Sequence, residues 1–396
     1  MPRQPASEEH HKSERLLETR LSAWQAMLVF VICLGLLSYG EVARSGGEPP
    51  EEPVGELGPA PVFPARVNQE SETVVQPGEP LAIPVSPSVD LDKFLFLPGI
   101  FWNKVGFSVN PANRQASLDF YRQYYLVSSP GPGWTGNVGA CSPGATSQAF
   151  RDAQALRLNY FRAMAGVPAQ VTLLDEYNRK AQQAALMMSA NSALSHDPPT
   201  SWKCYTAEGH EAAGNSNLAL GNYGVGALSL YMKDPGAGNS VVGHRRWILY
   251  PQTQNMGTGD IPNGSGYSGA NDLWVFDSHL WESRPATREA FVAWPPPGYV
   301  PYTIVYPRWS FSYANANFAN ATVSMTENGA NVPVTRYTPQ NGYGENTLVW
   351  IISSMNEDSS WPKPAADTTY VVTVSNVVIG GSPKSFQYTV IVFDPG

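Results

Sequence analysis

Apolar side chains recur every three to four residues in three stretches between residues 146 and 233, which is the spacing of helices buried on one face. The first stretch runs from Thr146-Ser147, a pair able to cap free backbone N–H groups, to Gly166. The second begins at Thr172-x-x-Asp175, the pattern of a capping box. The third covers 225–233, where Asp234-Pro235 ends it. The sequence therefore predicts three packed helices in this region.

The spacing of apolar residues is no longer helical beyond about residue 290, where β-branched and aromatic runs alternate with Gly, Asn, Pro and Asp turns. This pattern is typical of a β-sandwich, and we expect an immunoglobulin-like one. The stretch WPPPGYVP (294–301) is expected to be a stiff connector leading into it. Two further strands are predicted earlier, at Trp247–Tyr250 and Leu273–Phe276. The predicted strands of the sandwich are Tyr302–Tyr306, Ala321–Met325, Thr347–Ile352, Tyr370–Val374 and Phe386–Phe393.

The N-terminus carries a membrane-targeting pattern. Residues 23–39 have no charge and follow a polar segment with several basic side chains, whereas Arg44 is the only basic residue that follows closely. The positive-inside rule then predicts a cytoplasmic leader over 1–22, a signal anchor over 23–40 and a body outside the cytoplasm. We expect a single-pass protein of the cell membrane. Ser38-Tyr39-Gly40 leaves open the alternative of cleavage and secretion.

The rest of the chain divides into four parts. Residues 41–90 are rich in proline and poor in large apolar side chains, so we expect a disordered linker. Residues 91–145 are expected to be an extension that packs on the following domain. The helical pattern defines a domain over 146–290, and the strand pattern a second one over 291–396. The predicted fold class is α+β.

Charge and cysteine content narrow the partners and the compartment. With 25 Lys plus Arg against 33 Asp plus Glu, a net charge of −8 provides no basic field for a nucleic acid, so we expect no such partner. Cys33 lies in the apolar segment, which leaves Cys141 and Cys204 in the exported part. We expect these two to form a disulfide, with two unrelated buried thiols as the alternative.

Three of the six histidines, His196, His210 and His244, lie within one short region, which is a reason to test known catalytic and metal-binding patterns there. His210-Glu211 begins like the zincin motif HExxH, but Gly214 stands where the second metal ligand is needed. A serine triad would use His244 oriented by Asp234 or Glu211. Nothing in the sequence selects its nucleophile.

The order of several motifs resembles the CAP superfamily, which includes cysteine-rich secretory proteins, and in particular its bacterial branch. The motifs are NYFRAMAGVP (159–168), ALSHDP (193–198), NSNLA (215–219), YMKD (231–234), VGHRRWILYP (242–251) and NMGTG (255–259). The resemblance covers about 146–280 and implies an α-β-α sandwich with a cleft lined by two histidines and two acidic residues.

By position, the resemblance implies that His196 and His244 are the cleft histidines and that Asp234 is one of the acidic residues. Ser216 stands where the family has a second carboxylate, and Glu211 would compensate for it if its helix points inward. Alternation along a strand would turn one of Arg245 and Arg246 toward the site, and we expect Arg245 to hold an anionic ligand there; pairing with surface or inter-layer carboxylates is the alternative. Met256-Gly257-Thr258-Gly259 is expected to be a glycine turn near the cleft.

Two imidazoles at the floor of a cleft would form a partial site for Zn²⁺ or another divalent ion, with His196 and His244 as its ligands. No cofactor beyond such an ion is expected. The leading functional hypothesis is non-catalytic binding of a small apolar, lipid-like or cell-envelope ligand in this cleft. One alternative is a weak hydrolase that uses Asp234 and His244. Another is an adhesion or carbohydrate-binding protein that uses Trp350 or Trp361 of the β-sandwich.

Overall fold

The computed structural model describes residues 55–62 and 107–396. The predicted leader (1–22) and anchor (23–40) lie outside the described residues, as does most of the predicted linker (41–90). Within the described ranges, no helix has both the length and the apolar character that crossing a membrane requires.

The three predicted helices are confirmed. α3 (Gln148–Ala165) has Ser147 as its N-cap and Gly166 in the left-handed conformation after its last turn. α4 (Asp175–Asn191) and α6 (Gly224–Lys233) follow. The predicted capping box is wrong, because Thr172 belongs to a strand and no side chain caps the start of α4. Asp175 and Glu176 in the first turn instead place negative charge at the positive end of the helix dipole.

Three further helices complete the set in the described residues. α2 (Arg114–Phe120) continues into a π-helical turn at Tyr121–Tyr125. α5 (Ala207–Gly214) and α7 (Gly243–Ile248) flank the first sheet. Short 3₁₀ turns lie at Ala237–Asn239, Ser278–Trp281 and Tyr302–Ile304.

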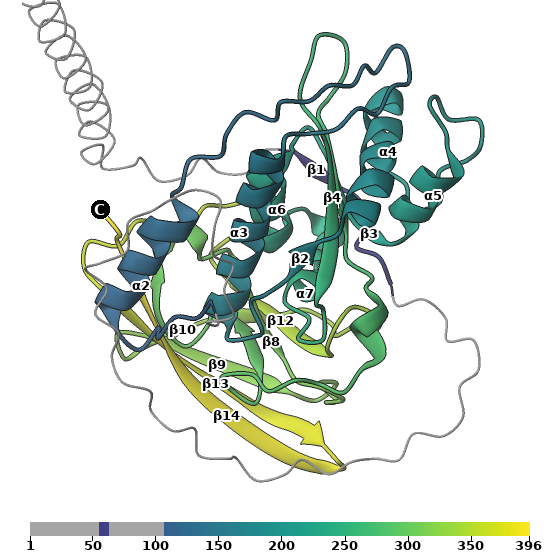
Figure 1. Ribbon diagram of the computed structural model, residues 1–396. Coiled ribbons are helices and arrows are strands. Elements are labelled where there is room, and N and C mark those ends of the chain that lie inside the picture. The colour runs from purple at the N-terminus through teal and green to yellow at the C-terminus, as the bar shows by residue number, and fades with distance from the viewer. Residues whose placement is uncertain (1–54, 63–106) are drawn as a thin grey trace, which may run out of the picture. The chain divides into compact units, whose positions relative to one another are not determined.

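The first sheet has five strands in the order β1-β3-β5-β4-β2. Their bounds are β1 (Glu56–Leu57), β2 (Thr172–Leu173), β3 (Ser216–Leu220), β4 (Asn255–Ile261) and β5 (Ala270–Trp274). Helices α4 and α5 cover one face and α3 and α6 the other, as Figure 1 shows, and the two faces bury separate apolar clusters. The expected α-β-α sandwich is therefore confirmed.

Two glycines of β4 let helix α4 lie directly on the sheet. A Cβ at Gly257 would come within 2.3 Å of the Tyr177 Cβ, and one at Gly259 within 2.1 Å of the backbone of Ala181. The prediction of a glycine turn at 256–259 is wrong, because these glycines serve close packing inside a strand.

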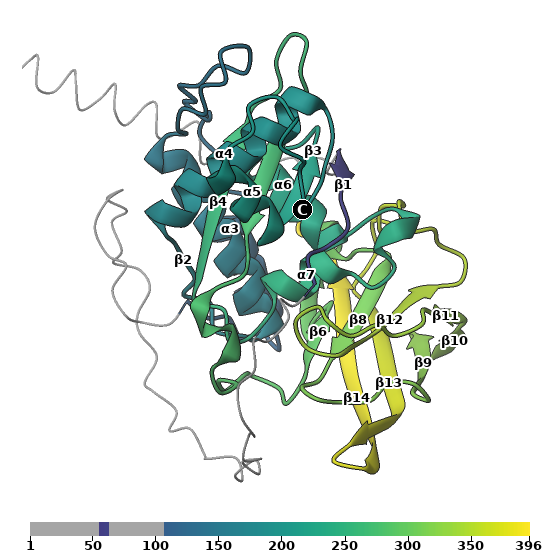
Figure 2. The ribbon, with the colours of Figure 1, turned by 90° about the vertical axis from the view of Figure 1, so that its right-hand side faces the viewer.

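The C-terminal part of the chain, from residue 292 onward, forms two further sheets (Figure 2). One sheet has the order β10-β9-β13-β14-β7 and the other β11-β12-β8-β6. The strands are β6 (Val292–Trp294), β7 (Gly298–Pro301), β8 (Arg308–Ser312), β9 (Thr322–Glu327), β10 (Ala330–Val332), β11 (Val334–Arg336), β12 (Thr347–Ile352), β13 (Thr368–Ile379) and β14 (Ser382–Phe393). Side chains of both sheets meet in one apolar core.

Several strand predictions need correction. Tyr302–Ile304 is a 3₁₀ turn, and the strand that follows, β8, was not predicted because Arg308, Ser310 and Ser312 interrupt its apolar pattern. The expected connector 294–301 contains the end of β6 and all of β7, which pairs with β14. Trp350 and Trp361 are 0% and 5% exposed, so they are core residues and offer no binding platform.

The described part of the N-terminal extension joins both halves. Phe120 of α2 stacks on Tyr160 of α3, and the Tyr299 backbone N–H donates to the carbonyl of Pro111. The predicted disulfide is confirmed, since Cys141 and Cys204 are bonded with their Cα atoms 5.0 Å apart. It ties the loop before α3 to the loop that precedes α5.

Candidate functional site

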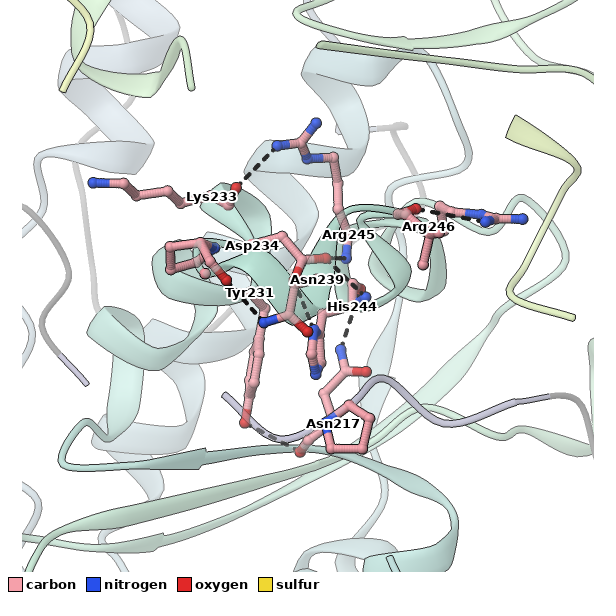
Figure 3. A network of polar contacts seen from close by, with 12 residues as sticks. Asn217, Tyr231, Lys233, Asp234, Asn239, His244, Arg245 and Arg246 are labelled. Atoms are coloured by element: carbon pink, nitrogen blue, oxygen red, sulfur yellow. Dashed lines mark hydrogen bonds and ion pairs between the residues drawn. The ribbon is translucent and has the colours of Figure 1, made fainter. Parts of the chain in front are cut away.

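Asp234 and His244 form a buried pair (Figure 3). Asp234 follows the last turn of α6 in the left-handed conformation (φ 55°), which turns its carboxylate toward the start of α7. The His244 ring donates from Nδ1 to this carboxylate at 2.8 Å, and the His244 backbone N–H donates to it at 3.1 Å. The Asp234 carboxylate thus both orients the His244 ring and caps the start of α7.

The surroundings of His244 leave its ring sealed. The ring stacks on Tyr231 with centroids 5.5 Å apart, and the Asn217 side-chain amide donates to the His244 carbonyl at 3.2 Å. The side chains of Asp234 and His244 are both 0% exposed. Nε2, the atom a general base would use, is buried and has no hydrogen-bonding partner. The expectation of a solvent-reachable His244 in a cleft is wrong.

The predicted strand over 247–250 is also wrong. Residues Gly243–Ile248 form α7, whose first N–H groups are capped by a carboxylate ten residues earlier in the chain. A cap contributed from another element leaves no local sequence pattern. The change from strand to helix decides where the arginines of this motif point.

Arg245 and Arg246 turn toward the β half. Arg245 donates to the carbonyls of Met232 at 2.6 Å and Arg308 at 2.7 Å, and Arg246 donates to the carbonyl of Glu345 at 2.9 Å. Burial lowers the pKa of Arg245 to about 10, which keeps it charged at neutral pH. The expectation that Arg245 holds an anion in the cleft is wrong, because backbone carbonyls already take its donors.

His196 lies on the loop after α4 and is partly buried. Its Nδ1 lies 2.6 Å from the carbonyl oxygen of Ala213, and its Nε2 is hydrogen-bonded to the carbonyl of Pro59. Burial lowers the pKa of His196, the two carbonyls oppose this, and the nearby His244 lowers it further. The rings of His196 and His244 have different hydrogen-bonding partners.

These residues do not fit a divalent metal. In the described ranges no three His, Cys, Asp or Glu side chains lie close enough together to hold an ion. Both ring nitrogens of His196 face carbonyls, and Nδ1 of His244 faces Asp234. Only Nε2 of His244 remains as a donor atom, and one imidazole is too few for a protein Zn²⁺ site.

Glu211 does not replace the carboxylate expected at Ser216. The Glu211 side chain is exposed on α5 and accepts a hydrogen bond from Lys180 at 3.0 Å. Ser216 is fully buried in β3, and the neighbouring strand places Asp272 on the same face. Burial raises the pKa of Asp272 well above its ordinary range, although the nearby Ser216 hydroxyl acts to lower it. Asp272 carries no motif, so the sequence did not indicate it.

A short segment of the predicted linker covers this region, and sequence reasoning missed it. Residues 55–62 include β1, which pairs antiparallel with β3. Beyond β1, the Trp247 indole N–H donates to the carbonyl of Pro61, and Ala60 is buried against Gly243. The linker prediction is therefore wrong for 55–62. The available signal was the uncharged run LGPAPV (57–62) in a stretch otherwise rich in glutamate.

Comparison with known proteins gives a family match and matches to solved structures. The crystal structure of PcoC, a methionine-rich copper resistance protein from Escherichia coli, is similar over 25% of this chain and 92% of its own, at 16% identity and a TM-score of 0.19. A likeness this low supports no functional statement. No curated protein matches the chain.

Residues 156–278 match the Cysteine-rich secretory protein family, CAP. The matched range runs from within α3 to the turn after β5, and so contains His196, Asp234 and His244. The three-layer arrangement of the matched residues and the order of their histidine motifs agree with this match. The chain therefore carries a domain of the Cysteine-rich secretory protein family, CAP, over residues 156–278.

Proposed function

We propose that the CAP domain is a non-catalytic binding module for a small apolar, lipid-like or cell-envelope ligand. The ligand takes the place of residues 55–62 on the surface formed by Leu194, His196, the edge of β3, Gly243 and Trp247, called the docking surface below. One observation carries the proposal. Two ring nitrogens of this surface, Nε2 of His196 and Nε1 of Trp247, are hydrogen-bonded to backbone carbonyls of residues 55–62, which lie outside the family match.

The buried pair supports a structural role in place of catalysis. His244 and Asp234 have the geometry of a base and its orienting carboxylate, which favours the hydrolase alternative. In the described residues, however, no hydroxyl or thiol is bonded to Nε2, and the ring is sealed from water. If the hydrolase alternative were correct, Asp234→Asn would abolish turnover of peptide and peptidoglycan substrates by a folded protein.

Binding to the full-length chain tests the proposal. Isothermal titration with a muropeptide, palmitate and phosphatidylglycerol micelles should show at least one saturable ligand. The double substitution His196→Ala, Trp247→Phe removes both of these ring nitrogens and should weaken that binding at least tenfold. His210→Ala, a partly exposed histidine paired with Asp197, is the matched control and should bind normally. A panel without binding, or binding that survives the double substitution, contradicts the proposal.

We also propose that the protein is anchored in the cell membrane with its body outside the cytoplasm. The uncharged segment 23–39 supports an anchor, and the Cys141–Cys204 disulfide is typical of an oxidising compartment. Membrane fractionation with protease treatment of intact cells tests this. Recovery of the body in the medium would favour cleavage and secretion.

A further inference from the structure

The docking surface already holds a chain segment, and the contacts of that segment indicate which ligand the surface suits. Glu56 and Leu57 pair with Leu220 and Ala219 at the outer edge of the sheet, and the Gly58 N–H donates to the Leu218 carbonyl at 3.3 Å. The segment thus adds a strand to β3. Main-chain hydrogen bonds of this kind bind an extended peptide largely without regard to its side chains.

The contact between the segment and the docking surface is of a different kind from Pro59 onward. Pro59 and Pro61 have no backbone N–H, so the segment cannot continue as a full ladder strand. A proline residue still offers a carbonyl acceptor. The Nε2 atom of His196 is hydrogen-bonded to the carbonyl of Pro59, and the indole N–H of Trp247 donates to the carbonyl of Pro61. The docking surface is therefore suited to a peptide whose prolines lack the backbone N–H groups of a β-strand but keep their carbonyl acceptors.

The side chains that face the surface are small. Gly58 and Ala60 are buried and Pro59 between them is exposed, as in a strand with one face covered, and the alternation ends at Pro61, which is also buried. A Cβ at Gly243 would lie 2.4 Å from the Ala60 Cβ, so residue 243 must be glycine for the segment to lie this close to α7. A Cβ at Gly58 would lie 3.4 Å from the Leu194 Cβ.

We infer that the docking surface is a binding site for an extended, proline-containing peptide with small residues at alternate positions, and that residues 55–62 are its tethered occupant. The inference rests on the proposed function and names the ligand class of the same surface. Because a tether holds its segment at millimolar effective concentration, an external peptide binds strongly only when the segment is displaced.

Four full-length proteins test the inference, with a labelled synthetic peptide of residues 53–64 as the probe. Wild type is the first. Ala60→Arg, which puts a long charged side chain at a buried position, is designed to displace the segment. Gly58→Cys with Leu194→Cys, in a Cys33→Ser background, locks the segment by a disulfide, since the Cβ spacing is close to that of disulfides. Gly58→Glu is a second displacing variant, and thermal melting confirms that each protein is folded.

Fluorescence anisotropy should show peptide affinity at least tenfold higher for Ala60→Arg than for wild type, and no measurable binding to the oxidised, locked chain. A peptide of the same composition in scrambled order should bind none of them. If neither displacing variant binds the peptide, or if all bind the scrambled peptide equally, the inference is wrong. The proposed function would still be supported in that case if wild type binds an envelope ligand and the His196→Ala, Trp247→Phe protein does not.

Discussion

The carboxylate of Asp234 binds His244 twice, through the ring Nδ1 and the backbone N–H, and neither side chain reaches solvent. This double contact joins the end of α6 to the start of α7. Because Gly243 and Trp247 lie on the same short helix as His244, the contact also fixes the position of these two docking-surface residues.

Removing the carboxylate should destabilise the fold. Asp234→Ala leaves the His244 Nδ1–H buried without a partner, and unsatisfied buried groups cost about 1–3 kcal/mol each. We expect the free energy of unfolding in urea to fall by at least about 2 kcal/mol, because the helix cap is lost as well. Asp197→Asn, which changes an exposed partner of His210, is the control and should shift it by less than about 0.5 kcal/mol. Equal effects would argue against the structural role of the pair.

Asp272 should make the protein less stable as the pH rises. Its pKa is raised in the folded state by burial, so the folded chain retains a proton that the unfolded chain loses above the ordinary pKa of aspartate. Asp272→Asn removes this penalty. We expect the variant to be more stable than wild type at pH 7.5, by about 1–3 kcal/mol, with a difference that shrinks toward pH 4. Urea unfolding at several pH values measures it, and a pH-independent difference would contradict the assignment.

Zinc should not stabilise the protein. His196 has both ring nitrogens at carbonyls and His244 has one at Asp234, so binding an ion would require breaking existing hydrogen bonds. Adding Zn²⁺ to wild type should leave Tm unchanged. A rise in Tm that the His196→Ala, His244→Ala protein lacks would show that a metal site exists.

Arg245 should hold the α-β-α half to the β half. Its guanidinium donates to carbonyls of α6 and β8 and is fully buried. Arg245→Lys keeps the charge but loses the planar set of donors, so we expect a loss of about 2 kcal/mol or more in the free energy of unfolding. Arg179→Lys on exposed α4 is the matched control and should be nearly neutral.

The sequence predicted those parts of the fold that local periodicity determines. The α3 signal, from the Ser147 cap to Gly166, was complete within the helix itself. The α7 helix was predicted as a strand because its cap comes from Asp234, and β8 was not predicted because its polar residues meet the buried arginines of α7. Both depend on a partner in another element, ten residues away for α7 and 63 residues away for β8.

The sequence predicted which residues belong to the candidate site better than how they are arranged in space. Motif order identified His196, Asp234 and His244, and the structure brings the last two into contact. Their burial depends on tertiary packing that no motif encodes. The role of residues 55–62 was missed because a proline-rich stretch offers no periodic pattern, and its bonds come from His196 and Trp247, more than a hundred residues away.

The most direct measurement of the central claim is disulfide trapping in the full-length Gly58→Cys, Leu194→Cys protein in a Cys33→Ser background. Peptide mapping by mass spectrometry without reductant should find residues 58 and 194 linked in nearly all molecules, beside the native Cys141–Cys204 bond. Free thiols at both positions in a folded protein with the native disulfide intact would show that residues 55–62 do not occupy the docking surface.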